Sequence, residues 1–433
     1  MALRHITIVG AGWAGLSAAV AAIQQGWQVT LYEAATTPGG RARALDQTFA
    51  NRALDNGQHI LIGAYRETLQ LMRTVGVHPE QMLQRVPLDL RDAQDQGLQL
   101  PAWPAPLNVL AGIAWARGWT WHDKTRLLTA CWHWQRMKFD CDADWTVMDL
   151  SQHAALTDRV MMQLIEPLCL SALNTPMHQA SARVFLRVLH DALLGGPGSS
   201  DLLIPRADLG QLFPHACVAW LQAHGAEVRM GQRLRAQDID PQRAQGDINH
   251  AWLLACPSWE AARLVTHLQP DWAQHANALP QEAIATVYLH ATDPHFEGLG
   301  RPMVALHSHA QAPAQFVFDR GALNGQARLL AAVVSASQGT REAIAEQVRA
   351  QVAQQLGLSS LDVVQTVVEK RATFACTPGL RRPEARITSQ VWACGDYLTG
   401  PYPATLEGAV RSGQQVIAQI RDVAHGEGLR LGV

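Results

Sequence analysis

The sequence predicts an α/β fold in which a domain built on a parallel sheet is interleaved with a second domain of mixed sheet and helices. Two patterns carry this prediction. A strand, a glycine-rich turn, a helix and a second strand open the chain at 6–33, and a strand and a long helix close it at 391–420. Strands that alternate with helices are typical of a parallel sheet. The length of 433 residues is too great for one simple core and indicates two domains.

The composition excludes several classes of protein. Hydrophobic residues make up 48% and charged residues 17%, and the net charge of −2 leaves no basic field for nucleic acid. No run of about 18 apolar residues predicts a transmembrane helix, and the N-terminus enters a strand without a signal-peptide pattern. The seven cysteines are dispersed without a CxxC, as is typical of a reducing cytoplasm. The eighteen histidines lack paired-ligand spacing, so we expect no metal site.

The N-terminal segment "ITIVGAGWAGLSAAVAAIQQGWQVTLYEA" has the pattern of a dinucleotide cradle. A short strand leads into a GxGxxG turn, a helix over 16–25 and a second strand over 28–32 that ends at an acid. The first glycine permits a tight turn, the second lets the backbone approach a pyrophosphate, and the third lets the helix pack closely. The acid is placed to accept hydrogen bonds from a ribose diol. The predicted cofactor-binding residues are Gly10, Gly12, Gly15 and Glu33.

The next residues distinguish between cofactors. Gly39, Gly40 and Arg41 follow the acid, with Arg43 two residues further on. A Gly-Gly-Arg at this place resembles the FAD-containing amine oxidase and carotenoid desaturase superfamily. The resemblance implies a Rossmann-like FAD domain, FAD as the cofactor, and an arginine that backs the pyrophosphate. The charge agrees, because guanidinium groups match phosphate oxygens.

The same superfamily pattern returns near the C-terminus in "VWACGDYLTGPYPATLEGAVRSG". The resemblance implies that Gly395 and Asp396 meet the ribityl chain and pyrophosphate of FAD. It also implies that the helix opened by Thr405 and Leu406 directs its N-terminus at the flavin, where its partial positive charge stabilises the reduced form. Taken alone, these small residues are equally typical of a closely packed helix. In the middle, 224–240 predicts two short strands, and the resemblance implies that Leu234 touches adenine.

The segment "DNGQHILIG", at 55–63, falls where the superfamily places a strand and a glycine segment under the flavin ring. Gly57 and Gln58 are therefore expected to bind the cofactor. His59 is the first candidate for the catalytic acid or its relay, and Asp55 is the second. The alternative is that Asp55 only closes a turn and that His59 is a satisfied polar residue.

Narrower phrases recur in order along the chain: "DNGQHILIGAYRETLQLMRTVG", "PLCLSALNTP", "ASARVFLRVLHDALLGG", "SDLLIPRADLGQLFP", "KRATFACTPG" and "GPYPATLEGAVRSG". Together they resemble the hydroxysqualene dehydroxylase family, over about 4–420. The resemblance implies that FADH2 reductively removes the hydroxyl of hydroxysqualene to give squalene and water, with an apolar isoprenoid as substrate. Tryptophans at 115, 119, 121, 132 and 134 stand where leucine and arginine are expected, which leaves the local packing open.

We expect the two domains to be built from interleaved segments. The FAD-binding domain is assigned to 1–85, 201–270 and 376–433, and the substrate domain to 86–200 and 271–375. Within the latter, "IATVYLHA", "AQFVFDRG" and "RLLAAVVSAS" predict strands of a pocket wall, and "REAIAEQVRAQVAQQLG" predicts an exposed amphipathic helix that ends at Gly357.

Residues 100–134 hold two apolar helical runs with tryptophans at their edges. One interpretation is a peripheral contact with the membrane, where squalene-like molecules reside. The other is a buried core packed against "VFLRVLHDALL". We therefore expect a cytoplasmic protein, with peripheral attachment to the inner membrane as the open alternative.

Rival functions share the FAD motifs. A carotenoid-type polyene desaturase or isomerase would carry all of them. An amine oxidase is disfavoured, because that branch tends to place an aromatic residue where Thr405 stands. A non-enzymatic lipid-binding chaperone, similar to the Rab GDP-dissociation inhibitors, would not need the intact cradle. No second GxGxxG indicates an NADPH site, so the sequence does not identify the electron donor for FAD.

Overall fold

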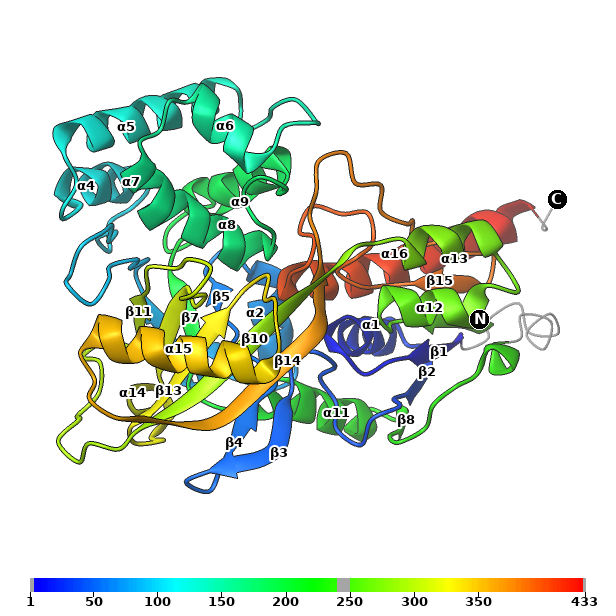
Figure 1. Ribbon diagram of the computed structural model, residues 1–433. Coiled ribbons are helices and arrows are strands. Elements are labelled where there is room, and N and C mark those ends of the chain that lie inside the picture. The colour runs from blue at the N-terminus through cyan, green and yellow to red at the C-terminus, as the bar shows by residue number, and fades with distance from the viewer. Residues whose placement is uncertain (1–3, 240–249, 431–433) are drawn as a thin grey trace.

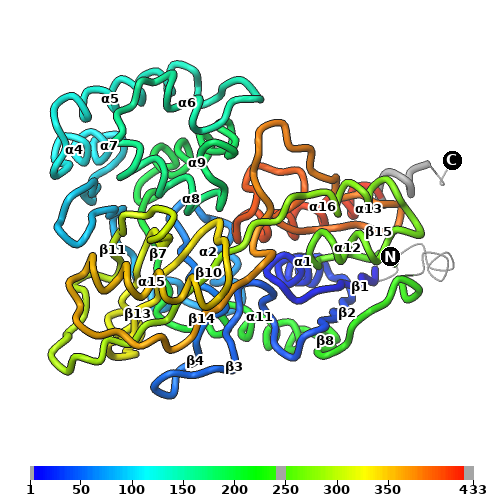
Figure 2. Tube along the Cα trace, viewed as in Figure 1, coloured from blue at the N-terminus to red at the C-terminus, as the bar shows by residue number. Residues whose placement is uncertain are grey.

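The computed structural model describes residues 4–239 and 250–430. Figure 1 shows a sheet with helices around it on the right, a long twisted sheet at the lower left, and a group of helices at the upper left. Figure 2 shows that segments from the start, the middle and the end of the chain run side by side around the right-hand sheet. Distant parts of the sequence therefore build one unit.

The right-hand sheet is parallel throughout and has the order β15-β9-β1-β2-β8. Its central strands are largely apolar and buried, with Ile6 and Ile8 fully buried, as expected for a parallel sheet covered on both faces. Its strands are β1 (His5–Val9), β2 (Gln28–Tyr32), β8 (Glu227–Arg229), β9 (His250–Leu254) and β15 (Val391–Ala393).

Helices pack closely around this sheet. The first, α1, contacts both α11 and the C-terminal α16. A Cβ at Gly413 of α16 would lie 2.3 Å from the Ala14 carbonyl oxygen, so the small residue permits direct contact between the helix backbones. The helices of this unit are α1 (Trp13–Gln24), α11 (Pro214–Ala223), α12 (Ser258–Val265), α13 (Pro270–Asn277) and α16 (Leu406–Arg430).

The second sheet is antiparallel and has the order β11-β12-β13-β10-β14. Helix α15 (Arg341–Leu356) packs against β10 and β14 through Ile344, Val348 and Val352, which recur every four residues and are buried. It ends at Gly357, whose φ of 67° is left-handed. The strands are β10 (Gln281–Ala291), β11 (Met303–Ala305), β12 (Phe316–Asp319), β13 (Leu329–Val334) and β14 (Leu361–Phe374).

The third part is a helical layer, with α4 and α5 at its outer end and α8 toward the sheets (Figure 1). Capping boxes begin α5, from Thr120 and Asp123, and α6, from Thr146 and Asp149. The layer consists of α4 (Leu107–Trp115), α5 (Trp121–Arg136), α6 (Val147–His153), α7 (Asp158–Val160), the π-helical turn η1 (Met161–Ile165), α8 (Glu166–Leu173) and α9 (Ala182–Leu194).

Small elements connect these parts. A hairpin is formed by β3 (Ala44–Phe49) and β4 (Arg52–Asp55), and a three-stranded sheet by β5 (Leu61–Ile62), β7 (Leu202–Pro205) and β6 (Leu83–Val86). The remaining helices are α2 (Arg66–Thr74), α3 (Pro79–Met82), α10 (Leu209–Leu212), α14 (Arg320–Asn324) and the 3₁₀ turn η2 (Ala236–Asp238).

The predicted α/β class is confirmed, and two local predictions are wrong. Within the described part of 224–240 only β8 forms, because a left-handed Gly231 turns the chain away and η2 follows. Within 55–63, where a strand and a glycine segment were expected, only Asp55 at the end of β4 and Leu61–Ile62 of β5 are strand, and 56–60 is irregular. The parallel sheet draws its strands from 1–85, 201–270 and 376–433, and the second sheet from 271–375, while the division into domains stays a prediction.

Candidate functional site

A cavity of about 590 Å³ lies where the parallel sheet, the second sheet and α8 meet. Nearly all of the residues predicted to bind the cofactor line it. They are Gly10, Gly12, Glu33, Gly40, Arg41, Arg43, Gly57, Gln58, Leu234, Gly395, Asp396, Thr405 and Leu406, joined by His59. Two predicted residues, Gly15 and Asp55, do not line it. The fold therefore brings the N-terminal and the C-terminal parts of the predicted FAD site together at one cavity.

The glycine turn at the end of β1 is shaped by close backbone contacts. Gly10 has a φ of 115°, and a Cβ there would lie 2.7 Å from the Ala255 carbonyl oxygen. A Cβ at Gly15 would lie 1.9 Å from the Gly10 carbonyl oxygen, so Gly15 serves the packing of helix on strand. Gly12 caps α1 without a side chain, which leaves the first N–H groups of the helix available to an anion beside the cavity.

The Glu33 carboxylate is held in place by the backbone. Its Oε2 accepts a 2.7 Å hydrogen bond from the Ala11 N–H, and its Oε1 accepts a 2.8 Å bond from the Ala35 N–H. Each carboxylate oxygen can accept a further bond. Glu33 lines the cavity, so it can also accept from the two hydroxyls of a ribose.

Arg41 and Asp396 join the two ends of the chain at the cavity. The Arg41 Nη2 donates to the Asp396 Oδ1 at 2.6 Å, and its Nη1 donates to the Ala372 carbonyl oxygen at 2.7 Å. Arg43 donates to the Gly40 carbonyl oxygen. Both arginines line the cavity, and so offer positive charge to a pyrophosphate.

These residues fit FAD. The bare N-terminus of α1 and two arginines suit a pyrophosphate, and the anchored Glu33 suits a ribose. Within 4–239 and 250–430, the buried Tyr397 hydroxyl, on another lining residue, has no hydrogen-bond partner. Such an orphaned group at a cavity wall is suited to a polar ligand. Over the same range, no cluster of histidine, cysteine or acidic side chains could hold a metal ion.

The N-terminus of α16 is fixed against α2 by a buried carboxylate. Glu407 is fully buried and accepts hydrogen bonds from the Thr68 N–H and hydroxyl, at 3.0 and 2.7 Å, and from the Glu67 N–H at 3.2 Å. Arg411 pairs with it at 2.8 Å. The Thr405 hydroxyl accepts from the Gly408 N–H at 2.9 Å and so caps α16. Thr405 and Leu406 thus have a rigid position at the cavity.

Asp55 lies behind the cavity wall, opposite the fully buried Arg320. Its Oδ2 is 3.3 Å from the Arg320 Nη2, and its Oδ1 accepts from the Leu209 N–H at 2.8 Å. Burial raises the pKa of Asp55 to about 6, against the opposing effect of Arg320. The Tyr288 hydroxyl bonds both the N–H and the carbonyl oxygen of Asp55. These contacts anchor the start of the irregular segment 56–60.

Arg320 also reaches the cavity wall. Its Nη1 donates to the Gln58 Oε1 at 3.1 Å, and its Nε donates to the Gln326 Oε1 at 3.2 Å. Gln58 is therefore oriented by a buried cation that sequence reasoning did not select. The available signal was weak: a charged residue directly after the strand β12.

His59 lines the cavity, and its Nδ1 lies 2.9 Å from the Gly57 carbonyl oxygen. A carbonyl only accepts, so the hydrogen-bond network assigns the proton to Nδ1 and leaves Nε2 as the acceptor. Burial lowers the pKa of His59, and the nearby Arg41 lowers it further, against the Gly57 bond. The imidazole is therefore neutral near neutral pH.

Sequence reasoning missed other lining residues, such as Tyr65, Asn174, Ser335 and Glu369. They come from a loop, the end of α8 and the second sheet, and although Tyr65, Asn174 and Ser335 lie within quoted phrases, no feature of those phrases singled them out. Glu369 accepts a 3.1 Å hydrogen bond from the Asn56 side chain. Only the tertiary fold brings these groups to the site.

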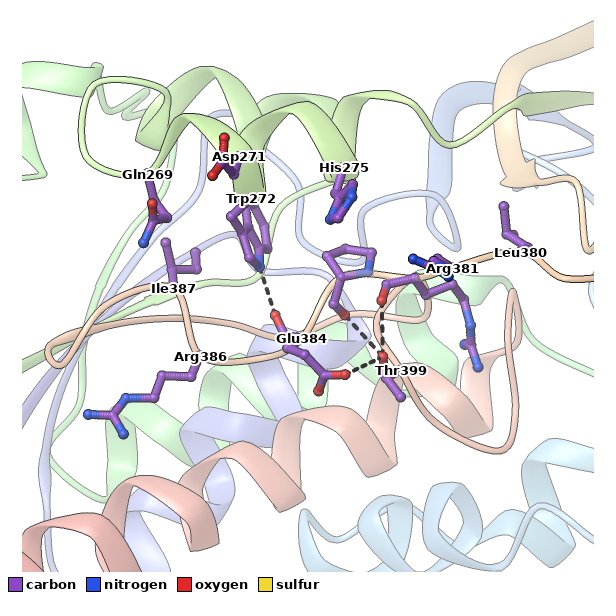
Figure 3. Close-up of a pocket in the computed structure, with 12 residues that line it drawn as sticks. Gln269, Asp271, Trp272, His275, Leu380, Arg381, Glu384, Arg386, Ile387 and Thr399 are labelled. Carbon is purple, nitrogen blue, oxygen red and sulfur yellow. Dashed lines mark hydrogen bonds between the residues drawn. The ribbon is translucent and has the colours of Figure 1, made fainter.

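A second hollow lies between α13 and the loop 380–387 (Figure 3). The Trp272 indole donates to the Glu384 carbonyl oxygen at 2.8 Å, and the Thr399 hydroxyl donates to the Glu384 Oε1 at 3.1 Å. None of the predicted cofactor-binding residues lines this hollow, so it is not the candidate site.

Comparisons with known proteins agree with the geometry. The family described as flavin containing amine oxidoreductase matches residues 13–420. A hydroxysqualene dehydroxylase of Rhodopseudomonas palustris is 28% identical over 95% of this chain and 97% of its own. One from Sinorhizobium fredii is 26% identical over 95% and 97%, respectively. The resemblance to this group of enzymes is thereby confirmed.

Two further comparisons are narrower. A zeta-carotene desaturase of Capsicum annuum is 37% identical, but over only 16% of this chain and 12% of its own. The solved structure of an oxidoreductase from Methanosarcina mazei is 13% identical and covers 96% of this chain and 100% of its own with a TM-score of 0.70, which confirms the fold. With the family match spanning nearly the whole sequence, the chain belongs to the flavin containing amine oxidoreductase family and is an oxidoreductase whose cofactor is FAD.

Proposed function

We propose that the protein catalyses the reductive dehydroxylation of hydroxysqualene to squalene and water. The observation that carries the proposal is the extent of the likeness: hydroxysqualene dehydroxylases match 95% of this chain. The match to a zeta-carotene desaturase covers 16%. Similarity confined to a short segment reflects a shared motif, whereas similarity along the whole chain includes the walls that select a substrate.

FAD, when bound in its reduced form, supplies a hydride to the carbon that loses its hydroxyl. The C–O bond breaks, a C–H bond forms, and the hydroxyl takes up a proton and leaves as water. The residues of the chain have three tasks: they bind the cofactor and orient the substrate, they exclude bulk water, and they deliver that proton.

Exclusion of water is the task of the apolar part of the cavity wall. Leu170 and Leu173 of α8 line the cavity, as do Ile60 and Ile284 from other elements. An allylic cation that forms as water leaves would be trapped by bulk solvent. Apolar walls lower the amount of water at the reacting carbon and so favour hydride transfer.

Delivery of the proton is assigned to His59 as an acid or relay. It lines the cavity, and its Nδ1 is held by the Gly57 carbonyl oxygen. With Nδ1 engaged, Nε2 is the nitrogen that takes up and passes on a proton. Asp55 is the second candidate, but it lies behind the wall, and through Arg320 it can orient Gln58 without passing on a proton, because a guanidinium and an amide do not relay one.

The same proposal includes the assignment of FAD-binding roles to the glycine turn, Glu33, Arg41, Arg43, Leu234 and Asp396. It also includes the interleaving of an FAD domain with a substrate domain. A polyene desaturase or isomerase is the second candidate, favoured by the short carotene desaturase match. The non-enzymatic alternative is set aside, because the chain is an FAD-dependent oxidoreductase.

The test is anaerobic. Purified protein is reduced with dithionite, hydroxysqualene is added, and the absorbance of the flavin is followed while products are extracted. Reoxidation with formation of squalene supports the proposal. A flavin that stays reduced overturns it. Oxidised protein given a polyene then tests the desaturase, and reduced protein given squalene alone is the control for background reoxidation.

A further inference from the structure

A cluster of large apolar side chains is exposed at the outer end of the helical layer. We call it the α4–α5 face and define it by Trp103, Leu107, Leu110, Trp115, Trp121 and Trp132. Trp121 is 79% exposed and Trp115 is 61% exposed. Scattered apolar residues on a surface need no explanation, but tryptophans and leucines gathered on two adjoining helices indicate a site of interaction.

Helix α4 is apolar on both sides. Gly112 and Ile113 face the interior, while Leu107 and Leu110 lie on the solvent side. A helix that is apolar all round is normally covered on every side. The Trp103 and Trp115 rings are 5.2 Å apart between centroids and extend this apolar side beyond the helix end.

The four tryptophans in and just before α5 form an exposed pair and a buried pair. Trp121 and Trp132 are eleven residues apart, which places them within about 20° of each other around the helix, and both are exposed. Trp119 and Trp134 are 7% and 3% exposed and belong to the core. The core interpretation of 100–134 therefore applies to Trp119 and Trp134 and not to Trp121 and Trp132.

Basic groups surround the face. Residues 100–139 contain five lysines and arginines and one acid, Asp123, which is buried in the capping box of α5. The Lys124 ammonium lies 5.6 Å from the centroid of the Trp121 ring, and the Arg136 guanidinium lies 4.6 Å from that of Trp132.

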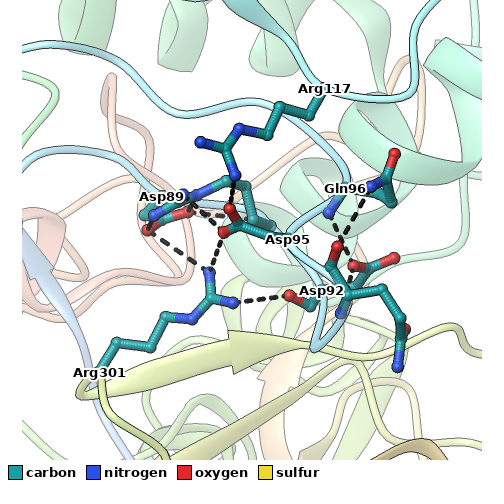
Figure 4. A network of polar contacts seen from close by, with 8 residues as sticks. Asp89, Asp92, Asp95, Gln96, Arg117 and Arg301 are labelled. Carbon is teal, nitrogen blue, oxygen red and sulfur yellow. Dashed lines mark hydrogen bonds and ion pairs between the residues drawn. The ribbon is translucent and has the colours of Figure 1, made fainter.

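Not all of these cations are available. Arg117 belongs to a network with Asp95, which also contacts Arg301 at 3.6 Å (Figure 4). This network ties the helical layer to the second sheet. Within the part of the chain that the structure describes, Lys124 and Arg136, which lie over Trp121 and Trp132, have no ion-pair partner. They are free to meet an external negative charge.

We propose that the α4–α5 face docks on a lipid bilayer with anionic headgroups. Exposed tryptophans beside unpaired cations have the composition of an interfacial anchor, with indoles at the headgroup level and basic groups on the phosphates. No helix within 4–239 and 250–430 is long and apolar enough to cross a membrane, so the attachment is peripheral. The same helical layer lines the cavity through α8, which places the cavity wall and the bilayer contact in one unit.

The test is co-sedimentation of the flavin-loaded protein with vesicles of phosphatidylglycerol and phosphatidylcholine in equal parts. The Trp115→Ser/Trp121→Ser variant is expected to bind these vesicles at least about 10-fold more weakly than the wild type. The Lys124→Gln/Arg136→Gln variant removes the two cations beside the tryptophans and is expected to lose about fivefold per charge on these vesicles, and wild-type binding falls with added salt. Matched controls change exposed residues elsewhere: Leu194→Ser/Val363→Ser and Arg341→Gln/Lys370→Gln.

The flavin content and the unfolding temperature of every variant are measured first. Both are expected to match the wild type, because the substituted side chains lie at the surface. Tryptophan variants that sediment like the wild type overturn the proposal. Equal binding to phosphatidylcholine alone overturns the role of charge. A concentration-dependent dimer that the tryptophan variant abolishes assigns the face to a second copy of the chain instead. The choice of lipid as partner rests in part on the proposed apolar substrate, but the assay contains no substrate, so its failure leaves the dehydroxylation proposal standing.

Discussion

The Arg41 guanidinium and the Asp396 carboxylate meet at 2.6 Å although 355 residues separate them in the sequence. The contact connects the Gly-Gly-Arg segment after β2 with the Gly-Asp segment after β15. Both residues line the cavity. The pair therefore sets the distance between the two halves of the FAD site, and not only the charge within it.

Removal of the carboxylate is expected to weaken FAD binding. In Asp396→Ala the Arg41 side chain loses its ion-pair partner and keeps only the Ala372 carbonyl oxygen. Truncating one member of such a pair typically costs enough to weaken binding about 10-fold or more. The measurement is the flavin-to-protein ratio after dialysis. Asp422→Asn, which changes an exposed acid of α16 paired with Arg421, is the control and should retain FAD. Unchanged flavin content in Asp396→Ala would contradict the assignment.

Alanine substitutions at Gly12 and Gly10 are expected to have different effects, the first on FAD binding and the second on folding. An alanine Cβ at Gly12 has no neighbour closer than the Gly40 Cα at 3.9 Å, so Gly12→Ala should fold normally. The same methyl group would stand where a pyrophosphate must approach, so FAD should be lost. Gly10→Ala places its Cβ 2.7 Å from the Ala255 carbonyl oxygen at a left-handed φ.

We therefore expect Gly10→Ala to lower the unfolding temperature of the FAD-free protein, whereas Gly12→Ala leaves it within a few degrees of the wild type. Thermal unfolding of the FAD-free proteins and flavin content measure the two effects separately. If Gly12→Ala retains FAD with wild-type affinity, the close approach of the backbone to the cofactor is refuted.

The cradle could be predicted from the sequence because its parts are local. Gly10, Gly12 and Gly15 lie within six consecutive residues, and the backbone itself holds Glu33. The segment 56–60 could not be predicted in the same way. Its place depends on Arg320 of α14 and on the Thr286 hydroxyl of β10, which accepts from the Gln58 N–H at 3.4 Å.

Which of the tryptophans are exposed also could not be predicted from the sequence. Trp119 and Trp121 are two residues apart, yet one is in the core and the other is exposed. Trp119 precedes the cap of α5 at Thr120 and packs into the core, where its indole donates to the Gln163 side chain at 2.7 Å, whereas Trp121 is the first residue of the helix. A pattern of residue types shows how many aromatic groups a segment has, but not which of them the fold covers.

The buried pair of Asp55 and Arg320 predicts a pH-dependent stability. Burial raises the pKa of Asp55 from 3.8 to about 6, so the folded state holds a proton more strongly than the unfolded state. The contribution of this carboxyl to stability is then greatest at low pH and is lost as the pH rises through the window from about 4 to about 6. Asn at this position keeps an acceptor for the Leu209 N–H and cannot titrate.

We expect the difference in unfolding free energy between the wild type and Asp55→Asn to decrease with rising pH by at most about 1.4 kcal/mol per pH unit in that window. Urea denaturation of both proteins across the window measures it. Asp362→Asn, which changes an exposed acid of β14, should show no such slope relative to the wild type. A constant difference for Asp55→Asn would mean that folding leaves the pKa of Asp55 unchanged.

Replacement of His59 tests the delivery of the proton. His59→Ala is expected to keep its flavin and to slow reoxidation by hydroxysqualene by about 10²- to 10⁴-fold, the usual share of a general acid. Because burial lowers the pKa of His59 below 6.5, the protonated form that donates is present at low pH and is lost as the pH rises through that pKa. The wild-type rate should therefore rise toward acid pH, and the rate of His59→Gln should not.

Anaerobic single-turnover reoxidation measures both the loss of rate and its pH dependence. The control is His267→Ala, which changes an exposed histidine after α12. A pH profile that is the same in the wild type and in His59→Gln would remove His59 as acid or relay, and the proton would then have to come from another group at the cavity.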